Sequence, residues 1–344
     1  MEHKINMGKS YHGTALVAIF IFMSWSIFIL LCGENPFYAL YYIVTGAFKS
    51  ADKIYSVINK LFLFFLTALA FSIPSWTGMF NVGADGQLIL GGFCSAALPL
   101  FFCTGFSPVD ITASLLAAML AGGLWALWPA LLRVYFEISE VVTTLLGNYI
   151  IVYFTEYMVN FPLRSKGSSV PRTDYIPESF HFPKLGSGSL SATVIIVIIT
   201  LAAVELFRRR SVSGYECQVT GQNPFLARQG GIFINSIRIK SMVIGGMLSG
   251  LAGGLLVLSL NYTFMAGFSA DYGMTGMLVG LIAGNLPVAV LAITGFFAVL
   301  QVGAINMQIF TDIPSEITGV LQSIMVFFIA ARGSIKFRKA GGGK

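Results

Sequence analysis

The chain has 344 residues, of which 56% are hydrophobic and only 10% are charged, and its formal net charge is +6. A soluble domain carries about 25% charged residues, so this composition excludes a soluble globular protein. The basic residues stand in polar segments between apolar runs, a placement that indicates membrane topology rather than nucleic-acid binding.

Apolar runs of about 20 residues, the length that crosses a hydrocarbon core of about 30 Å, recur along the whole sequence. Such runs must be helical in lipid, because every backbone polar group there needs an internal partner. We therefore predict an all-α polytopic membrane protein that forms one transmembrane domain, 1–344. The ten expected spans are 14–32, 54–76, 81–104, 109–132, 139–161, 190–207, 241–262, 272–286, 287–310 and 315–331.

The number of crossings depends on one region near the end of the chain. Span 272–286 is short, and Asn285-Leu286-Pro287 could be a break inside the membrane rather than a connection between two spans. The prediction is therefore about ten crossings, with eight or nine as alternatives.

The basic residues set the orientation. With both termini in the cytoplasm, the internal segments hold fourteen Lys and Arg residues and the external segments hold seven, as the positive-inside rule requires. Residues 162–189, which contain four prolines, are then an external loop that we interpret as an ordered lid or docking surface. Residues 208–240 form the large cytoplasmic loop, and either loop could instead be a plain connector.

Motifs for catalysis and for metal or nucleotide binding are not found in the sequence. The four cysteines have no C-x-x-C spacing, and the three histidines stand outside the expected spans. Gly8-Lys9-Ser10 is similar to the end of a P-loop, but His3 stands where that motif needs its first glycine. We expect no catalytic residue, no metal ligand and no cofactor in this chain.

A polar cluster interrupts the second and third apolar runs. Residues 80–92 read FNVGADGQLILGG and place Asn81, Asp85 and Gln87 among apolar residues, shortly after Pro74. We predict that the helix unwinds and restarts here, with Asn81 as a cap and Asp85 in the first turn of the new helix. A restarted helix leaves free N–H groups, which are tolerated only beside protein or water. A helix break and a polar solute pathway are both consistent with the cluster, and the two interpretations are compatible.

Two further patterns accompany this cluster. Glu140, Thr144 and Asn148 follow each other at four-residue intervals and therefore share one face of a helix. We interpret that face as bonding between helices, with solute contact as the alternative. The segments GADGQL at 83–88 and GMTGML at 273–278 are alike, and duplicated helical units are common in transport proteins.

Three motifs together carry a family resemblance over residues 60–331. FNVGADGQLILGG resembles the Asn-Ile/Val-Gly-Ala-Glu/Asp-Gly-Gln signature of permease subunits of bacterial ABC importers for nucleosides, in the branched-chain amino acid, ribose and nucleoside permease superfamily. EVVTTLLGNYI at 140–150 is similar to the family segment E-V-x-x-T-x-x-x-N-Y. VTGQNPFLARQGGI at 219–232 is similar to the cytoplasmic segment G-x-N-P-x-A-A-x-x-x-G-I; Leu226 replaces the first of the paired small residues, and Ala227 keeps the second.

The cytoplasmic segment also has a physical interpretation of its own. It predicts a short amphipathic helix with Pro224 in its first turn and Gly230-Gly231 at its end. In the family this helix seats in a groove of the ATPase, so the resemblance implies an ATPase-coupling role for Gly221, Asn223, Pro224, Ala227, Arg228 and Gly231. For the substrate pathway our candidates are Asn81, Asp85, Gln87, Glu140, Thr144 and Asn148.

The resemblance implies a type II-like permease with broken helices, which imports nucleosides by alternating access across the bacterial cytoplasmic (inner) membrane. It implies three partners: a second, shorter permease in a heterodimer, an ATPase subunit that binds ATP and Mg, and an extracytoplasmic solute-binding protein. Membrane lipid surrounds the assembly, and no nucleic acid is involved. Riboflavin or a simple sugar is an alternative substrate, and a stand-alone ion-coupled secondary transporter or channel is the alternative from a different class.

Overall fold

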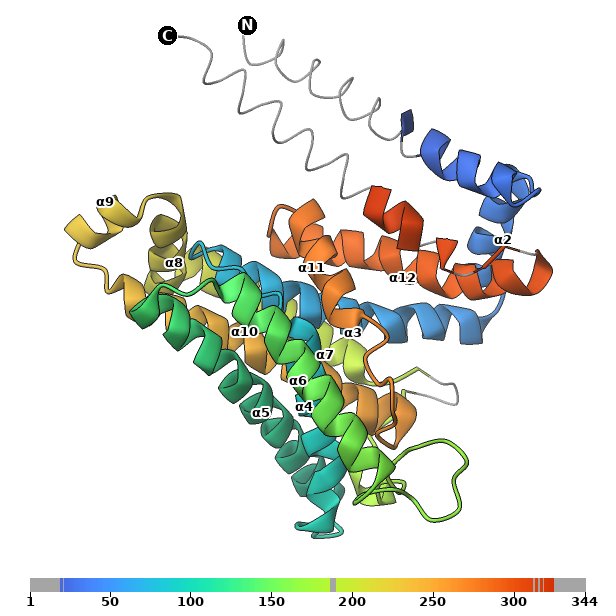
Figure 1. The fold of residues 1–344 in the computed structure, drawn as a ribbon, viewed down its shortest axis with the longest axis horizontal. Coiled ribbons are helices and arrows are strands. Elements are labelled where there is room, and N and C mark those ends of the chain that lie inside the picture. The colour runs from blue at the N-terminus through green and yellow to red at the C-terminus, as the bar shows by residue number, and fades with distance from the viewer. Residues whose placement is uncertain are drawn as a thin grey trace, which may run out of the picture. The chain divides into compact units, whose positions relative to one another are not determined.

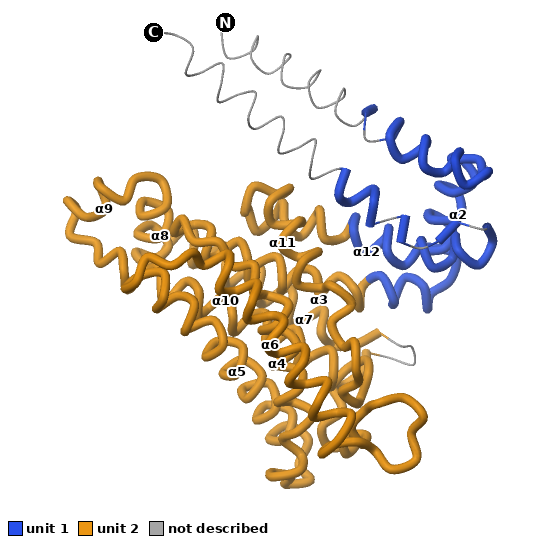
Figure 2. Tube along the Cα trace, in the orientation of Figure 1, with its two compact units in different colours: residues 1–57, 296–344 blue, residues 58–295 orange. Residues whose placement is uncertain are grey.

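The computed structural model of the chain describes residues 19–20, 22–185, 190–311, 313–314, 316–317 and 319–324. Over this part of the chain the regular structure is helical (Figure 1), and extended pairing is limited to two isolated bridges, Arg172 with Met265 and Lys184 with Ser191. The expected all-α class is therefore confirmed for the described residues. The helices belong to two compact units, one of residues 1–57 and 296–344 and one of residues 58–295 (Figure 2).

Four of the described helices are long and apolar enough to cross a membrane: α3 Ala51–Ser75, α5 Ser107–Phe136, α10 with its π-helical end, Ile234–Asn261, and α12 Pro287–Phe310. A bent pair, Phe22–Leu31 followed at 105° by α2 Pro36–Phe48, brings the number to five if it is one span. A polytopic membrane protein agrees with these helices. The expected count of ten crossings is not confirmed.

Two of the expected spans contain helices that are too short to cross. Span 81–104 contains α4, Ala84–Ala97, and span 272–286 contains α11, Tyr272–Ile282, with 14 and 11 residues. At about 1.5 Å per residue these helices measure about 21 and 16 Å, less than the hydrocarbon thickness of about 30 Å. Helix α11 ends at Ile282 and α12 begins at Pro287, as either interpretation of Asn285-Leu286-Pro287 requires.

The remaining helices refine the expected boundaries. Helix α6, Glu140–Asn160, and α7, Thr193–Arg210, match expected spans closely. The expected loop 208–240 is largely helical, because α8 Val212–Gln222 and α9 Pro224–Gln229 lie within it and α10 begins at Ile234. Most of span 315–331 and both chain ends lie outside the described residues, so the cytoplasmic location of the termini stays a prediction.

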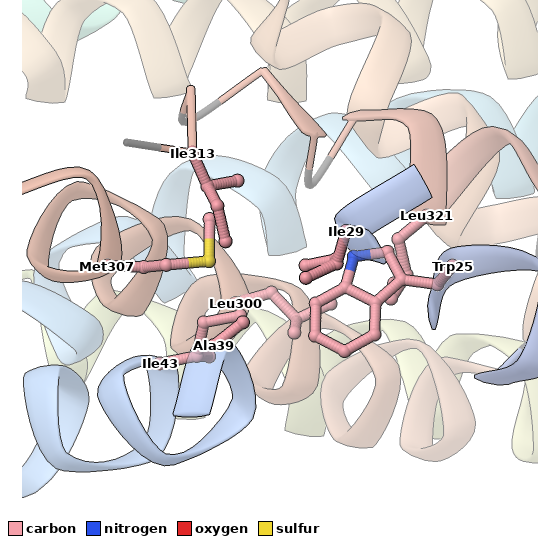
Figure 3. Close-up of a cluster of buried hydrophobic side chains, with 8 residues drawn as sticks. All are labelled: Trp25, Ile29, Ala39, Ile43, Leu300, Met307, Ile313 and Leu321. Atoms are coloured by element: carbon pink, nitrogen blue, oxygen red, sulfur yellow. The ribbon is translucent and has the colours of Figure 1, made fainter. Parts of the chain in front are cut away.

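The first unit is built around α2 and the second half of α12. Asn35 caps α2 by accepting a hydrogen bond from the backbone N–H of Phe37, and Pro36 occupies its first turn. The Asn306 Nδ2 atom donates to the carbonyl of Tyr42 at 2.9 Å, which ties α12 to α2. Figure 3 shows the apolar side chains that meet in this core: Trp25, Ile29, Ala39, Ile43, Leu300, Met307, Ile313 and Leu321.

In the second unit α10 packs against α4 and α5 (Figure 1), and glycines bring these backbones close together. A methyl group on Gly253 would collide with the carbonyl of Leu88 in α4, and one on Gly250 would collide with the carbonyl of Ala118 in α5. Small residues at helix contacts are the usual means of close packing in membranes.

The expected external segment is ordered over its described part. The backbone N–H groups of Thr173, Ile176 and Phe182 donate to the carbonyls of Phe264, Tyr262 and Leu258, at 2.8, 2.9 and 2.8 Å. The segment is thereby held against the end of α10 and the loop that follows it. Residues 186–189 lie outside the described residues.

Candidate functional site

The chain unwinds between α3 and α4, and Asn81 organises the unwound stretch. Its Oδ1 atom accepts from the backbone N–H of Gly83 at 3.1 Å. Gly83 itself occupies the N-cap position of α4, so Asn81 shapes the turn before the helix and is not the cap that we predicted. Asn81 and Gln87 exchange two amide hydrogen bonds, each 3.0 Å long, and Asn81 Nδ2 also donates to the carbonyl of Ala70 at 3.1 Å. Both side chains are buried. All four hydrogen bonds that the Asn81 amide can make are therefore used within the protein.

The polar face of α6 lies against the same stretch. Asn148 accepts from the backbone N–H of Gly86 at 2.9 Å and donates to the carbonyl of Val82 at 3.0 Å. It thereby satisfies one of the free N–H groups at the start of α4. Glu140 accepts from the backbone N–H of Phe80 at 3.3 Å and forms an ion pair of 3.0 Å with Arg133. Asn148 and Glu140 thus make the helix-to-helix bonds that we took as the first interpretation of this face.

Thr144 occupies the same face but bonds within its own helix. Its hydroxyl donates to the carbonyl of Glu140 at 2.6 Å, and its Cβ lies where a methyl group on Gly83 would come within 3.0 Å. Thr144 therefore contributes close packing against the break rather than a hydrogen bond to it.

Asp85 joins two short helices. It lies in the first turn of α4, as expected, and its Oδ1 atom accepts from the backbone N–H of Gly273, in the first turn of α11, at 2.8 Å. The hydroxyl of Ser269 donates to the same oxygen. The backbone of Gly273 packs directly on the backbone of Asp85, so no side chain separates the two turns. The two similar segments, 83–88 and 273–278, therefore begin two half-helices whose first turns touch.

A cavity of about 260 Å³ lies beside this junction. Helix α4 contributes Asp85 and Ile89, α6 contributes Val152, Thr155 and Glu156, and residues 264–271 form the remaining wall. Pockets for small ligands measure about 300–1,000 Å³, so this cavity suits a small solute. Several residues of its loop have left-handed backbone conformations, among them Ala270 at φ 33° and Asp271 at φ 58°. Such conformations cluster at functional sites.

The lining combines aromatic rings with carboxylates. Phe264 and Phe268 stack with ring centroids 4.4 Å apart, and the carboxylates belong to Asp85, Glu156 and Asp271. No lysine, arginine or histidine is among the described residues that line the cavity. The rings are 1% and 6% exposed and form an apolar part of the wall, and the carboxylates can accept hydrogen bonds from hydroxyl or amino groups.

Only one of the six expected pathway residues, Asp85, lines this cavity. Asn81, Gln87, Glu140, Thr144 and Asn148 lie in the buried network around the break. Glu156, Asp271 and the two stacked rings line the cavity but are not among the residues expected from the sequence. Glu156 could have been found, because an ionisable residue within the expected span 139–161 is itself a functional signal. Asp271 and the rings lie in a connection without regular structure, where the sequence pattern offers no comparable signal.

The opposite face of α6 is not covered by the described chain. Tyr149, Tyr153 and Tyr157, at four-residue intervals, are 55%, 69% and 59% exposed. Helix α6 has 21 residues and is long enough to span a membrane, yet it is not among the helices apolar enough to do so. The tyrosine hydroxyls near its middle have no hydrogen-bond partner within the described structure.

The segment that we expect to be cytoplasmic, 219–232, has the expected local structure. Pro224 is the first residue of α9, Asn223 caps it by accepting from the backbone N–H of Leu226 at 3.1 Å, and Gly231 follows at φ 77°. Ala227 is buried, whereas Leu226 is 57% exposed. Exposure explains why a large residue is tolerated at 226, and burial explains why 227 is small. Gly221 lies apart from α9, in the last turn of α8.

Comparison with known proteins decides the family. The family model described as "Branched-chain amino acid transport system / permease component" matches residues 53–330. The chain belongs to this permease family. Membership agrees with the several apolar helices and makes the protein a multi-pass membrane component of a transport system. No solved structure matches the chain.

Several transport permeases are similar to the chain over most of its length. The nucleoside ABC transporter permease NupB of Lactococcus lactis is 29% identical, over 92% of this chain and 90% of its own. The guanosine ABC transporter permease NupP of Bacillus subtilis is 27% identical, over 85% of each. The glucose ABC transporter permease TsgB13 of Haloferax volcanii is 25% identical, over 80% and 75%. A second Bacillus subtilis guanosine permease, NupQ, and a probable riboflavin import permease of Treponema pallidum are similar too.

Proposed function

We propose that the chain is the transmembrane permease subunit of an ATP-driven ABC importer and that it translocates nucleosides across the cytoplasmic membrane by alternating access. The observation that carries the proposal is the family match over residues 53–330, together with relatives named as nucleoside and guanosine permeases. The broken helices α4 and α11 support a type II-like architecture with a solute site at their junction. Transporters commonly bind solutes where half-helices meet.

The cavity beside Asp85 is the proposed solute site. A nucleobase would lie beside the apolar wall that contains Phe264 and Phe268, and ribose hydroxyls would donate to the carboxylates of Glu156 and Asp271. Because the cavity has three carboxylates and no basic residue among its described lining, it repels phosphate and favours an unphosphorylated solute. The buried network of Asn81, Gln87 and α6 would then hold the wall of the site rather than touch the solute.

Glucose and riboflavin are compared with nucleosides because two of the relatives are named as permeases for them. A simple sugar would also use the carboxylates. The glucose and riboflavin relatives are 25% and 26% identical to the chain, whereas the nucleoside and guanosine relatives are 29% and 27% identical. The relatives therefore favour a nucleoside.

The ATPase would bind at the cytoplasmic segment 221–231. Phe225 and Leu226 in α9 are 71% and 57% exposed, and Arg228 is exposed beside them. An apolar tip with an adjacent cation is suited to a groove in a soluble partner. ATP and Mg would be bound by that partner, so this chain would hydrolyse nothing itself.

A second permease would cover the tyrosine face of α6. Tyrosine hydroxyls in the middle of a membrane helix are costly to place in lipid, because lipid offers them no hydrogen-bond partner. Protein or water must therefore face Tyr149 and Tyr153. Bacillus subtilis has two guanosine permeases among the relatives, which supports a heterodimer with a second, shorter permease.

An extracytoplasmic solute-binding protein would dock on the external segment. A groove of about 580 Å³ lies between the end of α4 and this segment, and Arg164, Lys166, Asp174 and Tyr175 are among its lining residues. This assignment makes residues 162–189 external and 208–240 cytoplasmic, with both termini inside.

The test is uptake of a labelled purine nucleoside into proteoliposomes that hold the full assembly. We expect uptake that requires ATP and the solute-binding protein. Uptake of riboflavin or glucose instead would replace the substrate while keeping the importer. Ion-driven flux through this chain alone, without the ATPase, would favour a stand-alone secondary transporter or channel and would contradict the proposal.

A further inference from the structure

The turn at residues 76–78, which follows α3, touches the ATPase-facing part of the chain. A methyl group on Gly221, in the last turn of α8, would collide with the carbonyl oxygen of Trp76 and come within 3.2 Å of the backbone nitrogen of Gly78. The two backbones are therefore in direct contact, and no flexible side chain lies between them to absorb a displacement.

The start of α10 holds the same turn from the other side of the cytoplasmic segment. The hydroxyls of Thr77 and Ser241 are hydrogen-bonded at 3.0 Å, and Arg238 Nε donates to the carbonyl of Thr77 at 3.4 Å. The helices that precede and follow α9 thus both contact residues 76–78. If a partner moves α9, the movement must reach this turn through α8 or through the start of α10.

Trp76 extends the contact to the end of α11. Its indole Nε1 atom donates to the backbone carbonyl of Asn285 at 2.9 Å. Asn285 lies in the tight turn between α11 and α12 with φ 58°, and its own N–H donates to the carbonyl of Gly280 at 3.0 Å. The indole is therefore hydrogen-bonded to a turn that is itself hydrogen-bonded to the last residues of α11.

The opposite end of α11 forms part of the solute cavity. Asp271, which immediately precedes α11, lines the cavity, and Gly273 bonds to Asp85. Helix α11 is only about 16 Å long at 1.5 Å per residue, and a short, packed helix moves as one body. A displacement at Asn285 therefore reaches Asp271 and Asp85.

We propose that Trp76 is a positioning residue that transmits movement of the 221–231 segment through Asn285 and α11 to the cavity. This inference rests on the proposed function, because it requires a partner that moves the segment. It adds a specific connection, a single indole hydrogen bond, between the cytoplasmic segment and the solute site.

The test compares Trp76→Phe with Trp128→Phe in the reconstituted full assembly. Phenylalanine keeps an aromatic ring and removes the N–H group. Trp128 is the matched control, because it too is half-buried but its indole N–H has no hydrogen-bond partner in the described structure. We expect Trp76→Phe to lower solute uptake per ATP hydrolysed by about threefold to tenfold, the effect of one lost hydrogen bond. Trp128→Phe should leave that ratio unchanged.

A second readout needs no solute. The substitution Ala266→Cys, in the cavity lining, is introduced into a chain whose four native cysteines are replaced by alanine. The labelling rate of the new thiol is measured with and without ATP. Trp76→Phe should reduce the ATP-dependent change in labelling, and Trp128→Phe should keep it. Gly221→Ala should also reduce the ATP-dependent change in labelling. If Gly221 and Trp76 act on one connection, the double variant should reduce that change no more than the stronger single variant does.

The outcomes separate the two proposals. If the assembly imports another solute, the nucleoside proposal fails, and the labelling still tests the connection. If Trp76→Phe matches Trp128→Phe in both readouts, or if labelling of the Ala266→Cys chain that keeps Trp76 does not respond to ATP, the connection is wrong. Equal melting temperatures of the two variants establish that a loss does not come from misfolding.

Discussion

The carboxylate of Asp85, in the first turn of α4, accepts a hydrogen bond from the backbone N–H of Gly273, in the first turn of α11, although 188 residues separate them. A negative charge at this position is favourable to both helices, because the partial positive charge of a helix dipole lies at its amino end. Asp85 therefore fixes two half-helices to each other at the edge of the cavity.

Replacing Asp85 tests this joint. Asp85→Ala removes the acceptor and leaves the N–H of Gly273 unpaired, whereas Asp85→Asn keeps an acceptor and loses the charge. We expect Asp85→Ala to lower the free energy of unfolding by about 1–3 kcal/mol and Asp85→Asn to lower it by less. Thermal unfolding in detergent measures both. Equal stability of Asp85→Ala and the wild-type chain would mean that the bond does not hold the helices.

The cavity carboxylates should accept hydrogen bonds from the hydroxyl groups of the solute. Glu156→Gln should weaken the apparent affinity for a nucleoside by about tenfold, the order expected for loss of one charge-assisted hydrogen bond. The same change should have little effect on a dideoxynucleoside, which lacks the hydroxyl donors. Competition for uptake in the full assembly measures both affinities.

Glu137→Gln provides the control for this comparison, because Glu137 is exposed at the end of α5 and does not line the cavity. If Glu156→Gln affects both solutes equally, the carboxylate does not contact the ribose.

Close packing of α10 on α4 predicts different tolerance at two glycines. Gly253→Ala places a methyl group against the carbonyl of Leu88, and we expect a loss of about 1–3 kcal/mol from overpacking. Gly295→Ala, in α12, meets only Leu61 at 3.9 Å. It should be neutral or stabilise by up to about 1 kcal/mol, because alanine favours a helix over glycine. Melting temperatures in one detergent decide the order, and the reverse order would contradict this packing.

Cys217 in α8 should be almost unreactive in the folded protein. Burial, with a smaller contribution from Glu216, raises the pKa of its thiol from 9.0 to about 11. The reactive form is the thiolate, so maleimide labelling near pH 7 should be much slower at Cys217 than at the exposed Cys103. Mass spectrometry of labelled peptides measures the two rates, and in denaturant they should become equal.

The direction of the same shift also fixes a pH dependence. Because the folded-state pKa of Cys217 lies above the unfolded value, the protonated thiol is favoured by folding. Its contribution to stability is complete below pH 9 and is lost as the pH rises from 9 through about 11. Cys217→Ala should therefore flatten the decline in melting temperature over that interval. An unchanged decline would contradict the shift.

Local sequence signals predicted the local structure well. Pro74 and the glycines around Asn81 indicated the break between α3 and α4, and the Asn-Pro and Gly-Gly pairs indicated the bounds of α9. In each case one residue type favours one backbone conformation, so a few neighbouring positions carry the information. Helix α2 was not predicted, because its 13 residues are too few for a membrane span. Apolar runs of about 20 residues indicate only helices that are long enough to cross.

Tertiary partners were harder to infer. Nothing near Asp85 in the sequence identifies Gly273 as its partner, and the similarity between 83–88 and 273–278 indicates related local structure without indicating contact. The predicted spans 81–104 and 272–286 are longer than the helices α4 and α11 that they contain. Hydropathy does not distinguish a full crossing from a short helix followed by an apolar connection. The bond from Trp76 to Asn285 depends on how two turns fold together, which composition and periodicity do not encode.

The unwound stretch before α4 owes its path to side chains rather than to a regular main-chain ladder. Asn81, Asn148 and Glu140 supply partners that a continuous helix would take from its own backbone. In a helix no single codon specifies the route of the chain. Here side-chain hydrogen bonds contribute to it, so a single substitution at Asn81, Asn148 or Glu140 removes a bond from the unwound stretch beside the cavity. The path of this stretch therefore depends on side chains that also belong to the motifs of the family resemblance.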